Sequence, residues 1–329
     1  MVTSLAKSIH LYTFRLYYYS YLFVFQIRRE NGGHIESQQR ITGKRASSFM
    51  ELVVFDLDGT LLNKKSQLSE HTRDTLRQLR ERNIAYTVAT GRTLQGARNL
   101  LDNQGFTLPH IYKNGVLIWR PESDIYSHSQ LLTNSEIENV VEAFVSVEVT
   151  PFIFTVEPGN RHVAYHLPMQ NEAERRLATL FSQDRGMEVL PFTEMPYGAE
   201  ITNVSALGAR EAIESVANLV HTKEHLVAYA GTAIEGENLY WIDIHHSAAS
   251  KGEAVIKLKE DLGVSRVICF GDSDNDLSMF SVADEGYAPS NAKDEVLAVA
   301  TAVIGHHDED GISRFLCERF DLATHKLSG

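Results

Sequence analysis

Cysteine is scarce in this chain, whose 329 residues include only Cys269 and Cys317. Two cysteines are too few for a disulfide framework, and both lie in apolar or helical patterns, so we expect reduced, buried thiols. Positive charge is also in short supply, with 31 Lys and Arg against 43 Asp and Glu and a net charge of −12. This balance argues against nucleic acid or a membrane surface as the main partner. The expected compartment is the cytoplasm, because reduced thiols fit a reducing environment.

Long apolar runs are missing as well. The stretch LYYYSYLFVFQI at 16–27 is uncharged but falls short of the roughly 20 residues that a membrane-spanning helix needs, and no small-residue cleavage site follows it. Residues 1–49 hold seven Lys and Arg against two Asp and Glu, whereas residues 50–329 hold 24 against 41. We therefore expect 1–49 to be a poorly ordered extension, consistent with an over-extended translation start. A targeting segment is the alternative.

From Met50 onward, apolar strand patterns alternate with helical ones, which predicts a doubly wound parallel sheet of the Rossmann-like α/β type. Strands are expected at 53–55, 84–90 and 266–270, helices near 69–83, 93–104, 251–262 and 309–320, and a hairpin at 110–119 around Asn114 and Gly115. Residues 132–246 follow a different rhythm of helices and antiparallel strand pairs. We expect an α+β domain there, inserted into a core made of residues 50–131 and 247–329.

Polar side chains gather where the predicted parallel strands end. Asp56 and Asp58 follow the first strand, Thr90, Gly91 and Arg92 follow the second, and Asp272, Asp274, Asn275 and Asp276 follow the strand at 266–270. Because such strand ends meet at one crevice of an open α/β sheet, several carboxylates should lie together there. An all-oxygen set suits Mg²⁺ rather than zinc, and no cluster of His and Cys competes with it. The adjacent histidines at 245–246 and 306–307 are expected to lie at the surface.

Lys251 opens the predicted helix at 251–262, where a cation opposes the helix dipole. A plain surface lysine and part of an anion site are both compatible with that position. Thr90 alone is more typical of a strand-end or capping hydroxyl than of a ligand contact, and Asn114 alone is more typical of a turn residue than of a substrate contact.

Together the motifs DLDGT (56–60), TGR (90–92), KG (251–252) and GDSDND (271–276) resemble the haloacid dehalogenase (HAD) superfamily. Within it, the order and spacing from Met50 to about residue 320 are similar to the Cof-like phosphatases with a large α/β cap (subfamily IIB). The resemblance implies Asp56 as the nucleophile that forms an aspartyl-phosphate and Asp58 as the general acid/base. It implies Mg²⁺ bound by Asp56, the Asp58 backbone carbonyl and Asp272, with Asp276 in support. The implied phosphoryl and substrate contacts are Thr90, Gly91, Arg92, Asn114, Lys251 and Asn275.

The expected activity is therefore Mg²⁺-dependent hydrolysis of a small phosphorylated metabolite, with sugar phosphates first and flavin phosphates, pyridoxal phosphates and nucleotides next. A phosphomutase or phosphotransferase with the same core is the main alternative. A non-enzymatic phospho-receiver is a remote one, because such a domain is much shorter and has no use for an acid at Asp58. No feature of the sequence indicates an oligomeric state.

Overall fold

A computed structural model describes residues 51–128, 130–184, 187–233 and 238–323 of the chain. These residues form two compact units. Leu131–Ser247 contains one of them, the inserted unit, and the segments before and after it form the other, the core unit. The predicted extension at 1–49 lies outside the described residues.

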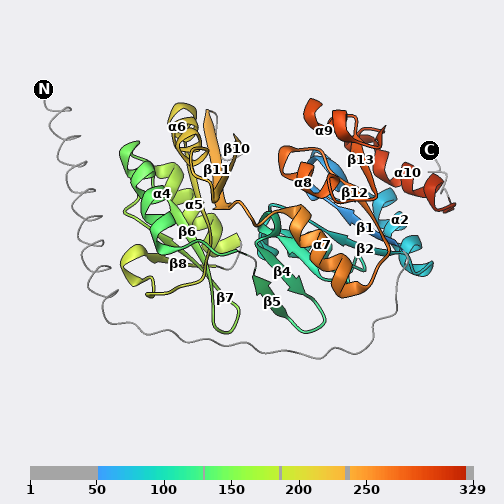
Figure 1. The fold of residues 1–329 in the computed structure, drawn as a ribbon, viewed down its shortest axis with the longest axis horizontal. Coiled ribbons are helices and arrows are strands. Elements are labelled where there is room, and N and C mark those ends of the chain that lie inside the picture. Colours follow the sequence, from blue (N-terminus) through green and yellow to red (C-terminus); the bar gives the residue numbers. More distant parts are fainter. Residues whose placement is uncertain (1–50, 129, 185–186, 234–237, 324–329) are drawn as a thin grey trace, which may run out of the picture. The chain divides into compact units, whose positions relative to one another are not determined.

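The core unit is built on a five-stranded parallel sheet with the order β14-β13-β12-β1-β2 (Figure 1). Its strands are β1 (Glu51–Phe55), β2 (Ala85–Val88), β12 (Arg266–Phe270), β13 (Glu285–Pro289) and β14 (Ala302–Ile304). The chain leaves β1 for β2 and later returns to β12 on the other side of β1, so the strand order reverses between β1 and β12. Doubly wound sheets bind their ligands at the carboxyl ends of the strands beside such a reversal.

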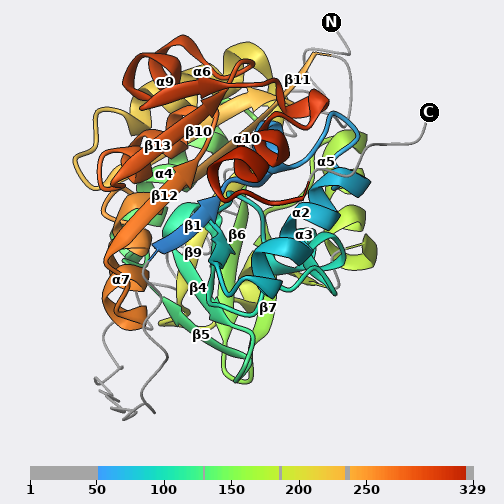
Figure 2. The same ribbon diagram turned by 90° about the vertical axis from the view of Figure 1, so that its right-hand side faces the viewer.

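Helices cover both faces of this sheet (Figure 2). Leu52 and Val54 of β1 pack in one core cluster with residues of α7 (Lys251–Leu262), α8 (Leu277–Phe280) and α9 (Asp294–Val299). On the opposite face, the ring of Phe270 lies 5.3 Å from that of Phe55 and 5.8 Å from that of Phe315 in α10 (Gly311–Arg319). Since β1 is buried on both faces, its sequence is an uninterrupted apolar run.

Two further helices and a small sheet complete the core unit. Helix α2 (Glu70–Glu81) packs against α10, and its N-cap Ser69 accepts a hydrogen bond from the Thr72 amide. Helix α3 (Leu94–Leu101) follows β2. The small sheet is antiparallel and consists of β3 (His110–Tyr112), β4 (Leu117–Arg120) and β5 (Ile125–His128). The predicted hairpin is confirmed by the β3–β4 pair, to which β5 adds a strand that the sequence did not indicate.

The inserted unit contains a six-stranded mixed sheet with the order β10-β11-β9-β6-β7-β8. Its strands are β6 (Phe152–Glu157), β7 (Arg161–His166), β8 (Glu188–Pro191), β9 (Ile201–Ala209), β10 (Leu226–Thr232) and β11 (Leu239–His246), and its helices are α4 (Asn134–Ser146), α5 (Glu172–Thr179) and α6 (Arg210–Val220). All neighbouring strands are antiparallel except β7 and β8, which are parallel. Side chains of α4 and α6 pack against one face of the sheet, whereas Leu177 of α5 packs against the other.

The predicted fold class, a doubly wound parallel core combined with an α+β unit, is confirmed. One detail was wrong: His245 is fully buried, because it lies inside β11 opposite Val227 of β10. Both cysteines are free and buried, as expected. Among the helices of the described ranges, none combines the length and apolar composition that a membrane span requires.

Candidate active site

Asp56 is the first residue after β1 and is almost fully buried. A tight turn at Leu57–Leu61 follows it and brings the backbone back toward the end of β12. Gly59 makes this turn possible, because its φ of +74° is unfavourable for other residues and a Cβ there would lie 2.5 Å from Oδ2 of Asp272. The DLDGT motif therefore places Asp56 beside the β12 carboxylates at the point where the strand order reverses.

Lys251 is completely buried and bridges two of these carboxylates. Its Nζ lies 2.5 Å from Oδ1 of Asp56 and 2.6 Å from Oδ1 of Asp276. Ser250 caps α7 just before it by accepting a hydrogen bond from the Glu253 amide. The two ion pairs outweigh the unfavourable helix dipole, so the surface-lysine alternative is excluded.

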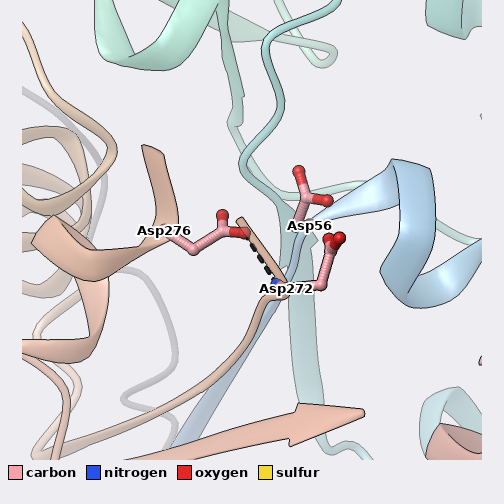
Figure 3. Close-up of side chains that lie close together, drawn as sticks. All are labelled: Asp56, Asp272 and Asp276. Atoms are coloured by element: carbon pink, nitrogen blue, oxygen red, sulfur yellow. Dashed lines mark hydrogen bonds between the residues drawn. The ribbon is translucent and has the colours of Figure 1, made fainter. Parts of the chain in front are cut away.

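Asp272 and Asp276 follow β12 and face Asp56 (Figure 3). Oδ2 of Asp276 accepts hydrogen bonds from the amides of Asp272 and Ser273, at 2.8 and 3.0 Å. Oδ1 of Asp272 accepts a hydrogen bond from Oγ1 of Thr60 at 2.8 Å. These contacts fix both carboxylates from their own backbone and from the β1 turn.

Asp56, Asp272 and Asp276 can each offer one oxygen within 4.8 Å of the others. Burial raises the pKa of Asp56; Lys251 opposes the shift, while Asp276 and Asp272 add to it. Burial also raises the pKa of Asp272, with a further contribution from Asp276. Burial alone would lower the pKa of Lys251, but Asp276 and Asp56 together raise it. When all groups are ionised, three carboxylates face one ammonium, and the two remaining negative charges together with the oxygen donors fit a divalent cation.

The second group of predicted residues is joined by hydrogen bonds. Thr90 is buried; its Oγ1 accepts a hydrogen bond from the Arg92 amide, and its carbonyl accepts one from the Asn114 amide. Gly91 packs closely on Asn114, since a Cβ there would lie 3.0 Å from Oδ1 of that residue. Oδ1 of Asn114 also accepts a hydrogen bond from Nδ2 of Asn275 at 2.9 Å, and Oδ1 of Asn275 is buried without a partner among the described residues.

Asp58 contributes no carboxylate to the acidic cluster. Its half-exposed side chain forms a two-pronged ion pair with Arg92, from Nε to Oδ2 at 2.7 Å and from Nη2 to Oδ1 at 2.6 Å. Arg92 also donates from Nη1 to the carbonyl of Gly96 in α3. The predicted role of Asp58 as a metal ligand concerns its backbone carbonyl and stays a prediction.

Sequence reasoning missed two residues that support this site. Thr60, which belongs to the DLDGT motif but has no predicted role, donates a hydrogen bond to Asp272 and orients it. Asn291 donates from Nδ2 to the carbonyl of Gly59 at 2.8 Å and accepts from the His307 amide, so it ties the β1 turn to the region after β13. Asn291 is a polar residue just beyond a strand end, which is the signal that identified the other site residues.

The sequence of this chain matches a known protein family. A family model described as haloacid dehalogenase-like hydrolase matches residues 53–316. This chain belongs to that family. The match spans most of the chain and includes all four motifs, so the predicted resemblance is confirmed.

Individual relatives match over nearly their whole length. The 5-amino-6-(5-phospho-D-ribitylamino)uracil phosphatase YitU of Bacillus subtilis is 27% identical over 277 residues, which cover 82% of this chain and 98% of the relative. The pyridoxal phosphate phosphatase YbhA of Escherichia coli is 25% identical, and the match covers 80% of this chain and 97% of the relative. The solved structure of the HAD subclass IIB sugar phosphatase BT4131 superposes with a TM-score of 0.63 at 19% identity, so it shares the fold. The superposition covers 83% of this chain and 100% of that protein. The predicted enzyme class, a HAD-type phosphatase, is confirmed.

Proposed function

We propose that this HAD-family enzyme is a Mg²⁺-dependent phosphatase that hydrolyses a small phosphorylated metabolite, most favourably a sugar phosphate, through an aspartyl-phosphate at Asp56. The observation that carries the proposal is the arrangement around Asp56. Its Oδ1 is held by the buried ammonium of Lys251, while its Oδ2 accepts no hydrogen bond from the described residues. One oxygen is thus fixed and the other is left to attack phosphorus.

In the first step, Oδ2 of Asp56 forms a bond to phosphorus as the bond from phosphorus to the leaving oxygen breaks. Asp58 gives its proton to that oxygen, so the alcohol leaves neutral. In the second step, Asp58 takes a proton from water as the water oxygen attacks phosphorus, and the Asp56 carboxylate is released with inorganic phosphate. Splitting the transfer in two lets the same acid serve in both halves.

Charge neutralisation makes the first step possible, because two anions must approach each other. Lys251 supplies one positive charge inside the site. A Mg²⁺ ion held by Asp56, Asp272, Asp276 and the Asp58 carbonyl would supply the Lewis acidity that stabilises charge on the phosphoryl oxygens. Burial, and after it the neighbouring carboxylates, raise the pKa of Asp56 and of Asp272, and this supports the assignment because a cation at that place would stabilise the ionised form of both groups.

Contacts to the phosphoryl group come from the hydrogen-bonded set formed by Thr90 and its neighbours. Oγ1 of Thr90 accepts from the Arg92 amide and keeps its own hydrogen to donate to a phosphoryl oxygen. Gly91, Asn114 and Asn275 form the wall beside it. Arg92 pairs with Asp58 in this structure, so an incoming phosphoryl group would compete for the guanidinium and release Asp58 for proton transfer.

The inserted unit, with residues 132–246 as its predicted extent, acts in this proposal as the cap whose side chains select the leaving group and so the substrate. Relatives named for a ribitylamino-uracil phosphate, for pyridoxal phosphate and for sugar phosphates support a small phosphorylated metabolite as the substrate class. No oligomeric state is proposed.

The test is a phosphate-release assay with Mg²⁺ over sugar phosphates, pyridoxal 5′-phosphate, flavin mononucleotide and nucleotides. We expect turnover of at least one of these that chelation of the metal abolishes and that Asp56→Asn abolishes for every substrate. Asp274→Asn is the matched control, because Asp274 is exposed, pairs with Lys293 and lies outside the metal cluster. Phosphate release that survives Asp56→Asn would contradict the proposal, and an isomerised phosphosugar without free phosphate would identify the mutase alternative.

A further inference from the structure

The core unit contains a recess that the proposed reaction does not use. It has a volume of about 360 Å³ and lies among α3, the loop after α3, β3 and β4. This volume falls within the range of small-molecule sites, which is roughly 300–1,000 Å³. None of the proposed catalytic, substrate or metal residues lines it.

Aromatic side chains form much of its wall: Phe106, His110, Tyr112 and Trp119. His110 meets each of the other three rings edge-on or nearly so, with centroids 5.2–6.0 Å apart. His110 is itself buried and receives or donates hydrogen bonds at both ring nitrogens, with the Tyr112 hydroxyl and the Phe106 carbonyl. Burial lowers its pKa to about 4, so it is a neutral aromatic group at pH 7. Phe106, His110 and Tyr112 are at most 7% exposed and Trp119 is half-buried, so a planar ring would pack on Trp119, with the other three rings behind it.

Two arginines, Arg80 and Arg98, also line the recess. Both residues are exposed, and neither side chain forms an ion pair or hydrogen bond with any described residue. Arg80 lies against the loop after α3, where its Nη1 is 3.2 Å from the position of a Cβ at Gly105. Asp102 is the one acidic side chain in the lining, which leaves the recess with a net positive charge in a chain whose own net charge is −12.

We propose that this recess, which we call the arginine recess, binds a small molecule that combines a planar aromatic ring with a phosphate or carboxylate group. The ring packs on the aromatic wall, and the anionic group accepts charge-assisted hydrogen bonds from Arg80 and Arg98. This binding needs neither Asp56 nor a metal ion, so it is independent of the proposed reaction.

Trp119 provides the readout, because it lines the recess and the chain has only one other tryptophan, Trp241. Trp241 is 40% exposed, so Trp241→Phe gives a background in which fluorescence reports on Trp119 alone. The titrations use AMP as the phosphate probe and nicotinate as the carboxylate probe, with EDTA present to prevent turnover. Adenosine and nicotinamide are the uncharged counterparts, and ribose 5-phosphate is the anion without a ring.

We expect AMP or nicotinate to quench Trp119 saturably, and which one binds more tightly identifies the anionic group. Each uncharged counterpart and ribose 5-phosphate should bind about tenfold more weakly or worse, since each lacks one half of the recognised chemistry. The double substitution Arg80→Gln with Arg98→Gln should raise the Kd of the better probe by about tenfold or more. Arg73→Gln, which removes one positive charge from an exposed residue on the same helix as Arg80, is the control for a general loss of surface charge and should leave the Kd unchanged.

Two results would overturn the proposal. One is the absence of saturable quenching by both AMP and nicotinate. The other is quenching that persists with unchanged Kd in the double arginine variant, because the probe would then be bound elsewhere, including at Asp56. Matching thermal midpoints of the variants would show that any loss of binding does not come from unfolding.

Discussion

Replacing Lys251 by methionine tests whether the buried ammonium is the electrostatic centre of the site. Methionine keeps the length and apolar stem of lysine but removes the charge that Asp56 and Asp276 share. Lys251 is fully buried, and both carboxylates are at least 90% buried, so water cannot replace the lost partner. We expect Lys251→Met to inactivate the enzyme and to lower the free energy of unfolding without metal by about 3–5 kcal/mol at neutral pH, the usual cost of removing one partner of a buried ion pair.

The loss must depend on pH, and the sign follows from the carboxylates. Lys251 opposes the upward shift in the pKa of Asp56, so removing it raises that pKa further. A carboxyl group whose pKa is higher in the folded than in the unfolded protein is destabilising above that folded pKa, and the penalty disappears as the pH falls through it toward the unfolded value of about 3.9. The difference between variant and native protein should therefore be smaller at about pH 4.5 than at about pH 7.5.

Urea unfolding at both pH values measures the difference. Lys259→Met is the matched control, because Lys259 lies on the same helix and pairs with Asp284 in a partly exposed ion pair at 3.1 Å. That change should cost within about 1 kcal/mol. Loss of less than about 1 kcal/mol in Lys251→Met, or an equal loss at both pH values, would refute the reasoning.

Three further predictions concern stability. Because the pKa of the buried His110 is about 4, the unfolded chain takes up the proton first as the pH falls from about 6.5 to about 4, and the free energy of unfolding should fall by up to about 3 kcal/mol. Urea titrations of His110→Gln should lack this pH dependence. Gly115→Ala should lower the unfolding free energy by at least about 2 kcal/mol, since φ is +104° and the new Cβ would lie 2.1 Å from the Ser250 carbonyl oxygen. A chain that starts at Met50 should keep its thermal midpoint and activity, because the first buried strand begins at Glu51.

Each of these predictions has its own contrary outcome. An acid slope that persists in His110→Gln would assign the proton uptake to another group. Gly159→Ala is the control for Gly115→Ala, because the φ of Gly159 is +81° but no atom lies within 4 Å of its Cβ position. It should lower the unfolding free energy by only about 1 kcal/mol. Equal losses in the two variants would exclude the close approach to Ser250 as the cause. A lower midpoint for the chain that starts at Met50 would show that residues 1–49 contribute to folding.

The core sheet was predictable because its signals are local. Val53, Val54 and Phe55 form an apolar run that a fully buried parallel strand requires, and turn or capping residues such as Ser69 and Asn114 mark where elements begin and end. The prediction that polar residues after the strands lie together followed from the topology, because parallel strands bring their carboxyl ends to one edge of the sheet. Short elements such as α8, α9 and β5 carry too few residues for a period to be recognised.

The contacts within the site were not predictable in the same way. Local rules disfavour a cation at the start of α7, and only the tertiary fold places Asp56, 195 residues away in sequence, beside the Lys251 ammonium. The Asp58–Arg92 ion pair and the support of Asp272 by Thr60 likewise depend on distances between segments. His245 was misread because burial of a polar residue depends on which strands flank it.

The central claim, that Asp56 is phosphorylated and Asp58 moves the proton, is tested most directly by the burst of nitrophenol from Asp58→Asn with nitrophenyl phosphate. Nitrophenolate leaves without a proton, so the first step should be nearly spared, whereas hydrolysis of the aspartyl-phosphate should slow by a factor of about 10² to 10⁴. We predict a burst approaching one equivalent of enzyme, absent from Asp56→Asn, together with full loss of activity on alkyl phosphates. Equal losses on aryl and alkyl substrates, with no burst from Asp58→Asn, would contradict the account.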